Sequence, residues 1–175
     1  MVVTWVFGRE FSDRTVKELL ALPTTRETIV TAKFIVIGVW SLAATLLVFG
    51  ISIVVGQLIV LPGWSAELLT STFVGVMGCA LLTLGLLPFV AFIASTGRGY
   101  MASFGWIILT MVFAQFSAIM GWGDRFPWAI PGLFSGVAGP RAEALGVHSY
   151  IIWLATFLLG LTVTYRWWRE ADQTR

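Results

Sequence analysis

FIVIGVWSLAATLLVFGISIVVGQLI, residues 34–59, decides the fold of this chain because it holds no charged residue and few polar ones. A helix needs ~20 consecutive apolar residues to cross the hydrocarbon of a bilayer. Lipid offers no water to the backbone, so a spanning segment of this length must bond its own N–H and C=O groups as a helix. The stretch therefore predicts a membrane-spanning helix.

Three more stretches of the chain share this property, and together they define the fold class. The four predicted spans are roughly 34–59, 69–94, 101–122 and 148–166. Hydrophobic residues make up 58% of the chain and charged residues only 11%, against about a quarter in soluble domains. We therefore expect an all-α membrane protein that forms a single transmembrane domain over residues 1–175.

The basic residues predict how the spans are oriented. Cytoplasmic segments of membrane proteins carry an excess of Lys and Arg. Nine of the 11 Lys and Arg residues lie in the N-terminal segment, the connection between spans two and three, or the C-terminal tail, and only Arg125 and Arg141 lie on the other side. An even number of spans places both termini on one side, so we expect both in the cytosol.

The segment before the first span predicts a short amphipathic helix on the cytosolic side. Ser12 or Asp13 can cap it, and Pro23 ends it. Its apolar face, at i, i+3, i+4 spacing, consists of Val16, Leu19 and Leu20. Such a helix can anchor the chain at the membrane surface or dock into a cytosolic partner, and periodicity leaves both open.

A second helix is predicted directly after this one. Thr24 and Glu27 have the spacing of a capping box. The helix should run through Lys33 into the first span. The chain would then turn sharply from the cytosolic surface into the membrane.

Proline and glycine predict two irregular features. Residues 126–140 are apolar but interrupted, which favours a short external re-entrant or interfacial hairpin over a further span. Pro88 lies inside the second span and should kink it. The kink can serve as a gating hinge or only fit the helix into a bundle, and both interpretations stay open.

No combination of residues predicts catalysis. Neither Lys17 nor Lys33 follows a glycine-rich loop, so a phosphate-binding motif is absent from the sequence and we do not expect the chain to hydrolyse ATP. His148 and Cys79 are the only residues of their types, which leaves no metal site and no cofactor to expect. His148 is either an interfacial residue or a proton- or ligand-handling one. Nucleic-acid binding is not expected, since no basic stripe is present.

Residues 7–34 resemble the permease subunits of type-two ATP-binding-cassette exporters, above all the bacitracin-resistance and lantibiotic-immunity kind. The pattern is an acidic residue, an Arg, a Thr, paired leucines, a Pro and an Arg, followed by a Lys that enters a span. In this sequence these residues are Glu10, Arg14, Thr15, Leu19, Leu20, Pro23, Arg26 and Lys33.

This resemblance implies a function and its partners. Residues 9–26 would be the cytosolic coupling helix region, which seats in a groove of a separate ATPase subunit of the exporter. Its docking residues would be Glu10, Arg14, Thr15, Val16, Leu19, Leu20, Pro23 and Arg26. The resemblance further implies a second permease copy or homologue, a prokaryotic cell membrane, and peptide antibiotics or other hydrophobic compounds as cargo.

The chain departs from the family pattern in one respect. Family members usually have six spans, and this sequence begins where the second would be ending. The alternative hypothesis is therefore a truncated, non-transporting membrane remnant or a regulatory or assembly scaffold.

Overall fold

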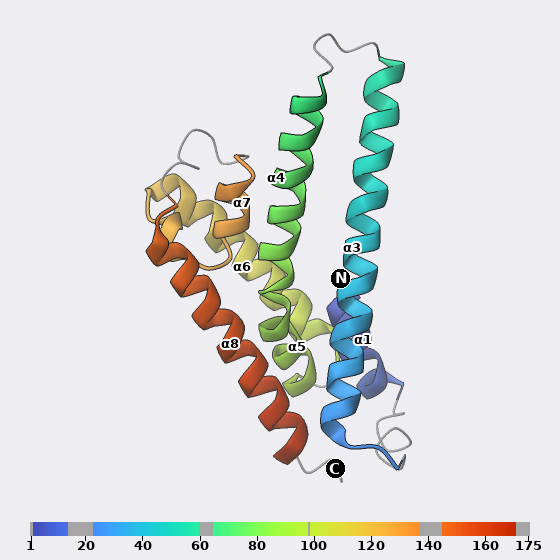
Figure 1. Cartoon of the computed structure of the whole chain (residues 1–175). Helices are drawn as coiled ribbons and strands as arrows, with labels where there is room; N and C mark the ends of the chain where they lie inside the picture. Colours follow the sequence, from blue (N-terminus) through green and yellow to red (C-terminus); the bar gives the residue numbers. More distant parts are fainter. Residues whose placement is uncertain (1, 14–22, 60–64, 98, 137–144, 171–175) are drawn as a thin grey trace.

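The computed structural model describes residues 2–13, 23–59, 65–97, 99–136 and 145–170, and of residues 10–12 only the backbone. Within these ranges every regular element is a helix, as predicted, and no strand is present. Long helices make up most of the molecule, and shorter ones pack at their sides (Figure 1).

Four segments of the described chain are long and apolar enough to cross a membrane, which confirms the predicted number of spans. They are α3 (Arg26–Leu58), α4 (Ala66–Leu84) together with α5 (Leu87–Thr96), α6 (Tyr100–Met120) and α8 (Val147–Glu170). Much of their apolar surface faces away from the chain. This suits a bilayer, where lipid is as apolar as the side chains.

Helices α3 and α4 form an antiparallel pair that extends beyond the rest of the molecule (Figure 1). The rings of Phe49 and Phe73 hold the pair together, with centroids 5.4 Å apart. Helix α3 has 33 residues. At ~1.5 Å per residue it measures about 50 Å. It therefore exceeds the ~30 Å of hydrocarbon and leaves its polar first turn outside.

The second span is broken between Leu84 and Leu87, as Pro88 predicts. Proline has no N–H to donate and clashes with the carbonyl four residues earlier, so an uninterrupted helix cannot form. The chain makes a tighter turn here, in which Leu86 N donates to Thr83 O at 3.1 Å. The span therefore consists of two helices that meet at a bend.

Helix α1 (Val2–Ser12) was not predicted. The sequence pattern placed a helix after Ser12, whereas α1 ends there, and the predicted amphipathic helix lies outside the described residues. Val3 and Phe7 are four positions apart and both are buried. That spacing was the available signal, but the stretch was too short to predict a span. Figure 1 places α1 beside the lower half of α3.

The cap of α3 differs by one residue from the prediction. Thr25, rather than Thr24, is the N-cap, and its hydroxyl accepts a hydrogen bond from Thr28 N at 3.3 Å. Thr25 has the extended backbone that an N-cap requires, with φ −71° and ψ 145°. The capping box predicted from Thr24 and Glu27 is therefore wrong, and Glu27 is free to pair elsewhere.

The described part of the connection between α6 and α8 contains two short helices, η1 (Gly123–Arg125) and α7 (Ile130–Phe134). Helix α7 packs against α4, where the Cys79 thiol lies 3.5 Å from the carbonyl oxygen of Pro131. Residues 137–144 of the predicted hairpin lie outside the described residues. Its re-entrant or interfacial character therefore stays a prediction.

Candidate functional site

The predicted docking residues lie where α1 ends and α3 begins, and the structure describes few of them. Pro23 and Arg26 are described in full, and Glu10 by its backbone in α1. The others lie outside the described residues: Arg14, Thr15, Val16, Leu19 and Leu20. What the structure does show is how the two ends of this segment are held.

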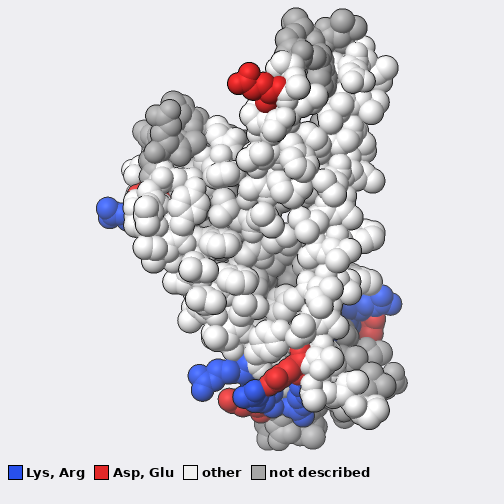
Figure 2. Space-filling model, in the orientation of Figure 1, with Lys and Arg blue, Asp and Glu red and all other residues white. Residues whose placement is uncertain are grey.

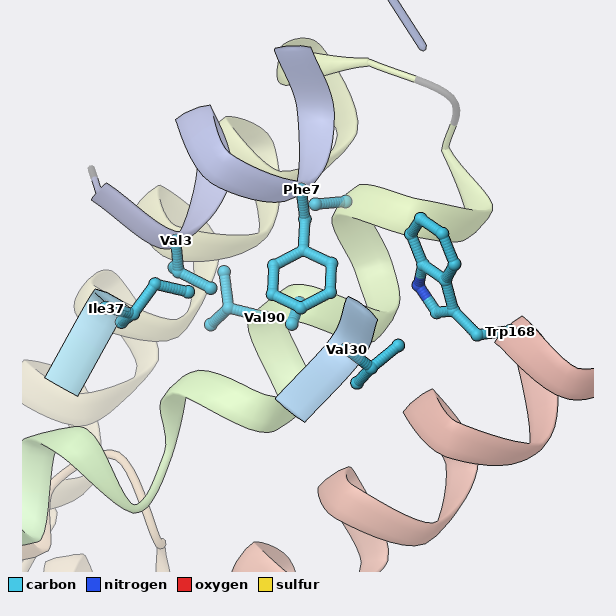
Figure 3. Packing of buried hydrophobic residues seen from close by; sticks show 8 residues of the cluster. Val3, Phe7, Val30, Ile37, Val90 and Trp168 are labelled. Carbon is cyan, nitrogen blue, oxygen red and sulfur yellow. The ribbon is translucent and has the colours of Figure 1, made fainter. Parts of the chain in front are cut away.

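Both ends are anchored in one cluster of buried side chains, to which four helices contribute (Figure 3). Phe7 of α1 is completely buried at its centre. Its ring lies 5.3 Å from that of Phe34 and 6.2 Å from that of Trp168, the latter edge-on. Such aromatic pairs contribute about 0.5–1.5 kcal/mol beyond their buried area. The cluster also contains Val3, Val30, Ile37, Val90, Ala91 and Ala94.

Lys33 joins α1 to α3 and α8 at this cluster. Its ammonium donates a hydrogen bond to the carbonyl oxygen of Val6 at 2.9 Å. It also lies 5.0 Å from the ring centre of Phe7 and 5.1 Å from that of Trp168. Cations over aromatic faces are attracted to the ring quadrupole, more strongly where water is excluded. Lys33 therefore holds the last turns of α1 in place.

Arg26 and Glu27 fasten the start of α3 to the end of α8. The guanidinium of Arg26 donates to the carbonyl oxygens of Trp168, at 3.3 Å, and Arg169, at 3.2 Å. These carbonyls belong to the last turn of α8, which has no later N–H to bond within the helix. Glu27 accepts from Arg169 Nε at 3.0 Å and forms an ion pair with the same guanidinium. Tyr165 adds a bond to Thr31 at 2.8 Å.

Helix α8 is bound along its length to the broken second span. The indole N–H of Trp168 donates to Ser95 Oγ at 3.0 Å, and the hydroxyl of Thr164 donates to Pro88 O at 2.9 Å. Further along, Trp153 Nε1 donates to Leu82 O at 2.8 Å, which satisfies a carbonyl freed by the bend. The bend and the end of α8 are thus parts of one connected structure.

We call the end of the molecule where α1 ends, α3 begins and α8 ends the charged end. Acidic and basic side chains gather there, at the bottom of Figure 2, whereas the middle of the face shown carries no charged residue. The charged end includes Arg9, Asp13, Glu27, Arg166, Arg169 and Glu170, which form ion pairs. Charges of both signs suit a surface that contacts water or a polar partner rather than lipid.

A further polar pair of the described residues lies at the opposite end of the molecule. His148 Nε2, at the start of α8, lies 2.8 Å from Asp124 Oδ2 in η1. Asp124 is the less exposed of the two side chains. The pair ties the start of the fourth span to the end of the third, so one structural role of His148 is evident. The described residues contain no group of three or more His, Cys, Asp or Glu that could hold a metal ion.

Sequence reasoning missed the residues that make the charged end rigid. It named Lys33 as a motif residue but could not give it a partner, and it placed Trp168 only near a span end. Arg26 was predicted to position a docking helix, and the structure shows it bonded to the end of α8. These contacts join residues more than a hundred positions apart, so spacing carries no signal of them.

Comparison with known proteins supplies independent findings. Residues 1–117 match the family described as ABC-2 family transporter protein. Over 178 aligned residues the chain is 28% identical to the bacitracin transport permease protein BCRB of Bacillus licheniformis. That alignment covers 98% of this chain and 82% of the relative. No solved structure matches the chain significantly.

Proposed function

The chain belongs to the ABC-2 family of transporter proteins and is a membrane permease subunit of an ABC exporter, and from this premise we propose how it meets its ATPase partner. In this family ATP hydrolysis belongs to a separate subunit. Residues 9–26 are the surface that this subunit grips. Nucleotide-driven movement of the ATPase is then passed to the membrane helices at the charged end.

The observation that carries the proposal is that both flanks of residues 14–22 are fixed. Before the segment, α1 is held by Phe7 and by the bond from Lys33 to Val6. After it, α3 begins with Arg26 bonded to the end of α8. A force on the segment is thus not lost in flexible linkers, since packed interfaces shift between discrete arrangements rather than deform continuously. It reaches α3, α5 and α8 together.

The proposed cargo follows from the relative's name. That relative is named a bacitracin transport permease protein. We extend this to peptide antibiotics or other hydrophobic compounds as cargo of the present chain. The uncharged, apolar middle of the molecule is compatible with a compound that enters from lipid (Figure 2).

The proposed orientation places the charged end in the cytosol. Basic residues from three separate segments meet there: Arg9 of α1, Arg26 of α3, and Arg166 and Arg169 of α8. This is the side on which Lys and Arg accumulate in membrane proteins. A reporter that is active only outside the cytosol, fused after Arg175, should be silent. Activity at that fusion site would reverse the orientation.

A second permease copy or homologue is part of the proposal. Helix α3 is covered by its own chain over only a small part of its surface, and many of its large apolar residues are exposed. Lipid and a second permease compete for such a surface. The pathway would then lie between the two permeases. Each permease would still contact an ATPase subunit at its own charged end.

The test is co-purification of the full chain with the ATPase encoded beside it. Leu19→Asp together with Leu20→Asp should abolish the association, because two carboxylates cannot be buried in an apolar groove without partners. Lys17→Asp, a control on the predicted polar face of the same segment, should keep it. If the double variant still co-purifies at the wild-type ratio, the docking proposal is wrong.

A further inference from the structure

A partly enclosed pocket of about 390 Å³ lies beside the bend of the second span. The bend contributes Leu86 and Leu87, α6 forms the facing wall, and Trp128 and Leu133 close the end near α7. The volume falls within the ~300–1,000 Å³ typical of small-molecule pockets. The pocket is therefore large enough for part of a ligand and is bordered by the element that bends.

The pocket is apolar, with one exception that matters. No charged residue is among the described residues that line it, and its threonine hydroxyls donate to their own helices, Thr83 to Cys79 O and Thr110 to Trp106 O. Gln115 also lines it, and no hydrogen bond joins its amide to any described residue. A primary amide offers two donors and one acceptor.

The position of Gln115 makes this free amide costly. Helix α6 ends at Met120, so Gln115 lies about 8 Å from the helix end at ~1.5 Å per residue. Gln115 is exposed on the surface of the chain, and a hydrocarbon layer of ~30 Å centred on the 21 residues of α6 would cover this depth. A polar group that loses water without gaining a hydrogen bond is destabilised. An occupant of the pocket that bonds Gln115 removes this penalty.

We propose that this pocket binds the apolar chain of an uncharged compound that carries an amide, and that Gln115 recognises the amide. The apolar wall fits an alkyl chain or a branched aliphatic side chain. The described lining residues offer no charge to an ionic group, which would be desolvated there without a partner among them. The inference rests on the proposed function, since it places part of the transported compound at the bend that α8 holds.

The experiment is photolabelling of the purified full chain in phospholipid nanodiscs, read by peptide mass spectrometry. Three diazirine probes are compared: an N-alkyl acetamide, the same alkyl chain without the amide, and a phosphatidylcholine labelled in one acyl chain. We expect the amide probe to label the pocket face of α6, around Met111 and Ala114, at least about threefold more than the hydrocarbon probe. A threefold difference in labelling corresponds to the average free energy of one hydrogen bond between helices in a membrane.

Two variants and a control decide the outcome. Gln115→Leu keeps the shape of the side chain, so it should still be labelled but lose the preference for the amide probe. Ala114→Phe should fill the pocket and suppress labelling. Val112→Phe adds the same ring on the exposed, lipid-facing side of α6 and should change nothing. Equal labelling of the pocket by phosphatidylcholine, or labelling that Ala114→Phe leaves unchanged, would overturn the proposal.

These results are separable from the test of ATPase docking. Gln115 and Ala114 are far along α6 from the charged end, so both variants should co-purify with the ATPase as the wild type does. If docking fails while the labelling holds, the docking proposal is wrong and the pocket assignment stands. If docking holds while the labelling pattern fails, only the pocket assignment is wrong.

Discussion

Gly160→Ala is the sharpest test of the contact between α8 and the bend. A methyl group on Gly160 would lie 2.7 Å from the backbone nitrogen of Phe89 and 3.1 Å from the carbonyl carbon of Pro88. Both atoms belong to the backbone of α5, so no side chain can rotate away. The two helices must move apart to accommodate the methyl group.

The expected loss of stability follows from three contributions. Overpacking costs about 1–3 kcal/mol. Separation of the helices also weakens the bond from Thr164 to Pro88 O, now 2.9 Å, and such bonds in membranes contribute ~0.6 kcal/mol on average. Alanine is better than glycine inside a helix by about 1 kcal/mol, which opposes the loss. The free energy of unfolding of Gly160→Ala should therefore fall by about 0.6–2.6 kcal/mol.

The control is Gly105→Ala in α6, where an added methyl group meets no atom within 4 Å. Only the preference for alanine over glycine inside a helix acts there, so the free energy of unfolding of this variant should rise by up to about 1 kcal/mol. The assay is unfolding of the purified chain in detergent micelles by increasing SDS, followed by circular dichroism. The reasoning is refuted if Gly160→Ala is as stable as Gly105→Ala or more stable.

The remaining predictions use the same titration. Trp153→Phe keeps a ring but removes the N–H that bonds the last turn of α4, so the free energy of unfolding should fall by about 0.6–1.7 kcal/mol; an unchanged value would show that the bond is not needed. Ser95→Ala leaves the buried indole N–H of Trp168 without its acceptor, and a loss of about 1–3 kcal/mol is expected. Arg169→Gln breaks the exposed ion pair with Glu27 and should not shift the unfolding midpoint, because exposed pairs are screened. A clear drop in that midpoint would show that the ion pair between Arg169 and Glu27 does stabilise the fold.

The spans could be predicted because the bilayer imposes its requirement on each segment separately. Any stretch of ~20 apolar residues meets it, whatever the rest of the chain does. The bend at Pro88 was predictable for a similar reason, since proline breaks the helix ladder by its own covalent structure. The docking residues Leu19 and Leu20 stay predictions, because their segment lies outside the described residues.

The charged end could not be predicted in the same way. Lys33 finds its hydrogen-bond partner in α1, and Arg26 finds its partners at the end of α8. Nothing near either residue in the sequence marks these pairings. Helix α1 was missed because its apolar face is two turns long and contributes to a core only once α3, α5 and α8 surround it.

The sequence by itself determined that the described part of the chain holds four helical segments long and apolar enough to cross a membrane, and where the second of them bends. The reason is that each spanning segment must satisfy its own backbone in lipid. Only the tertiary structure decided which small and polar residues meet: Gly160 against the bend, Lys33 against α1, and Gln115 at a pocket without a partner. Helices in lipid gain little from burying apolar area against each other, so close fit and hydrogen bonds select the arrangement, and both depend on residues distant in the sequence.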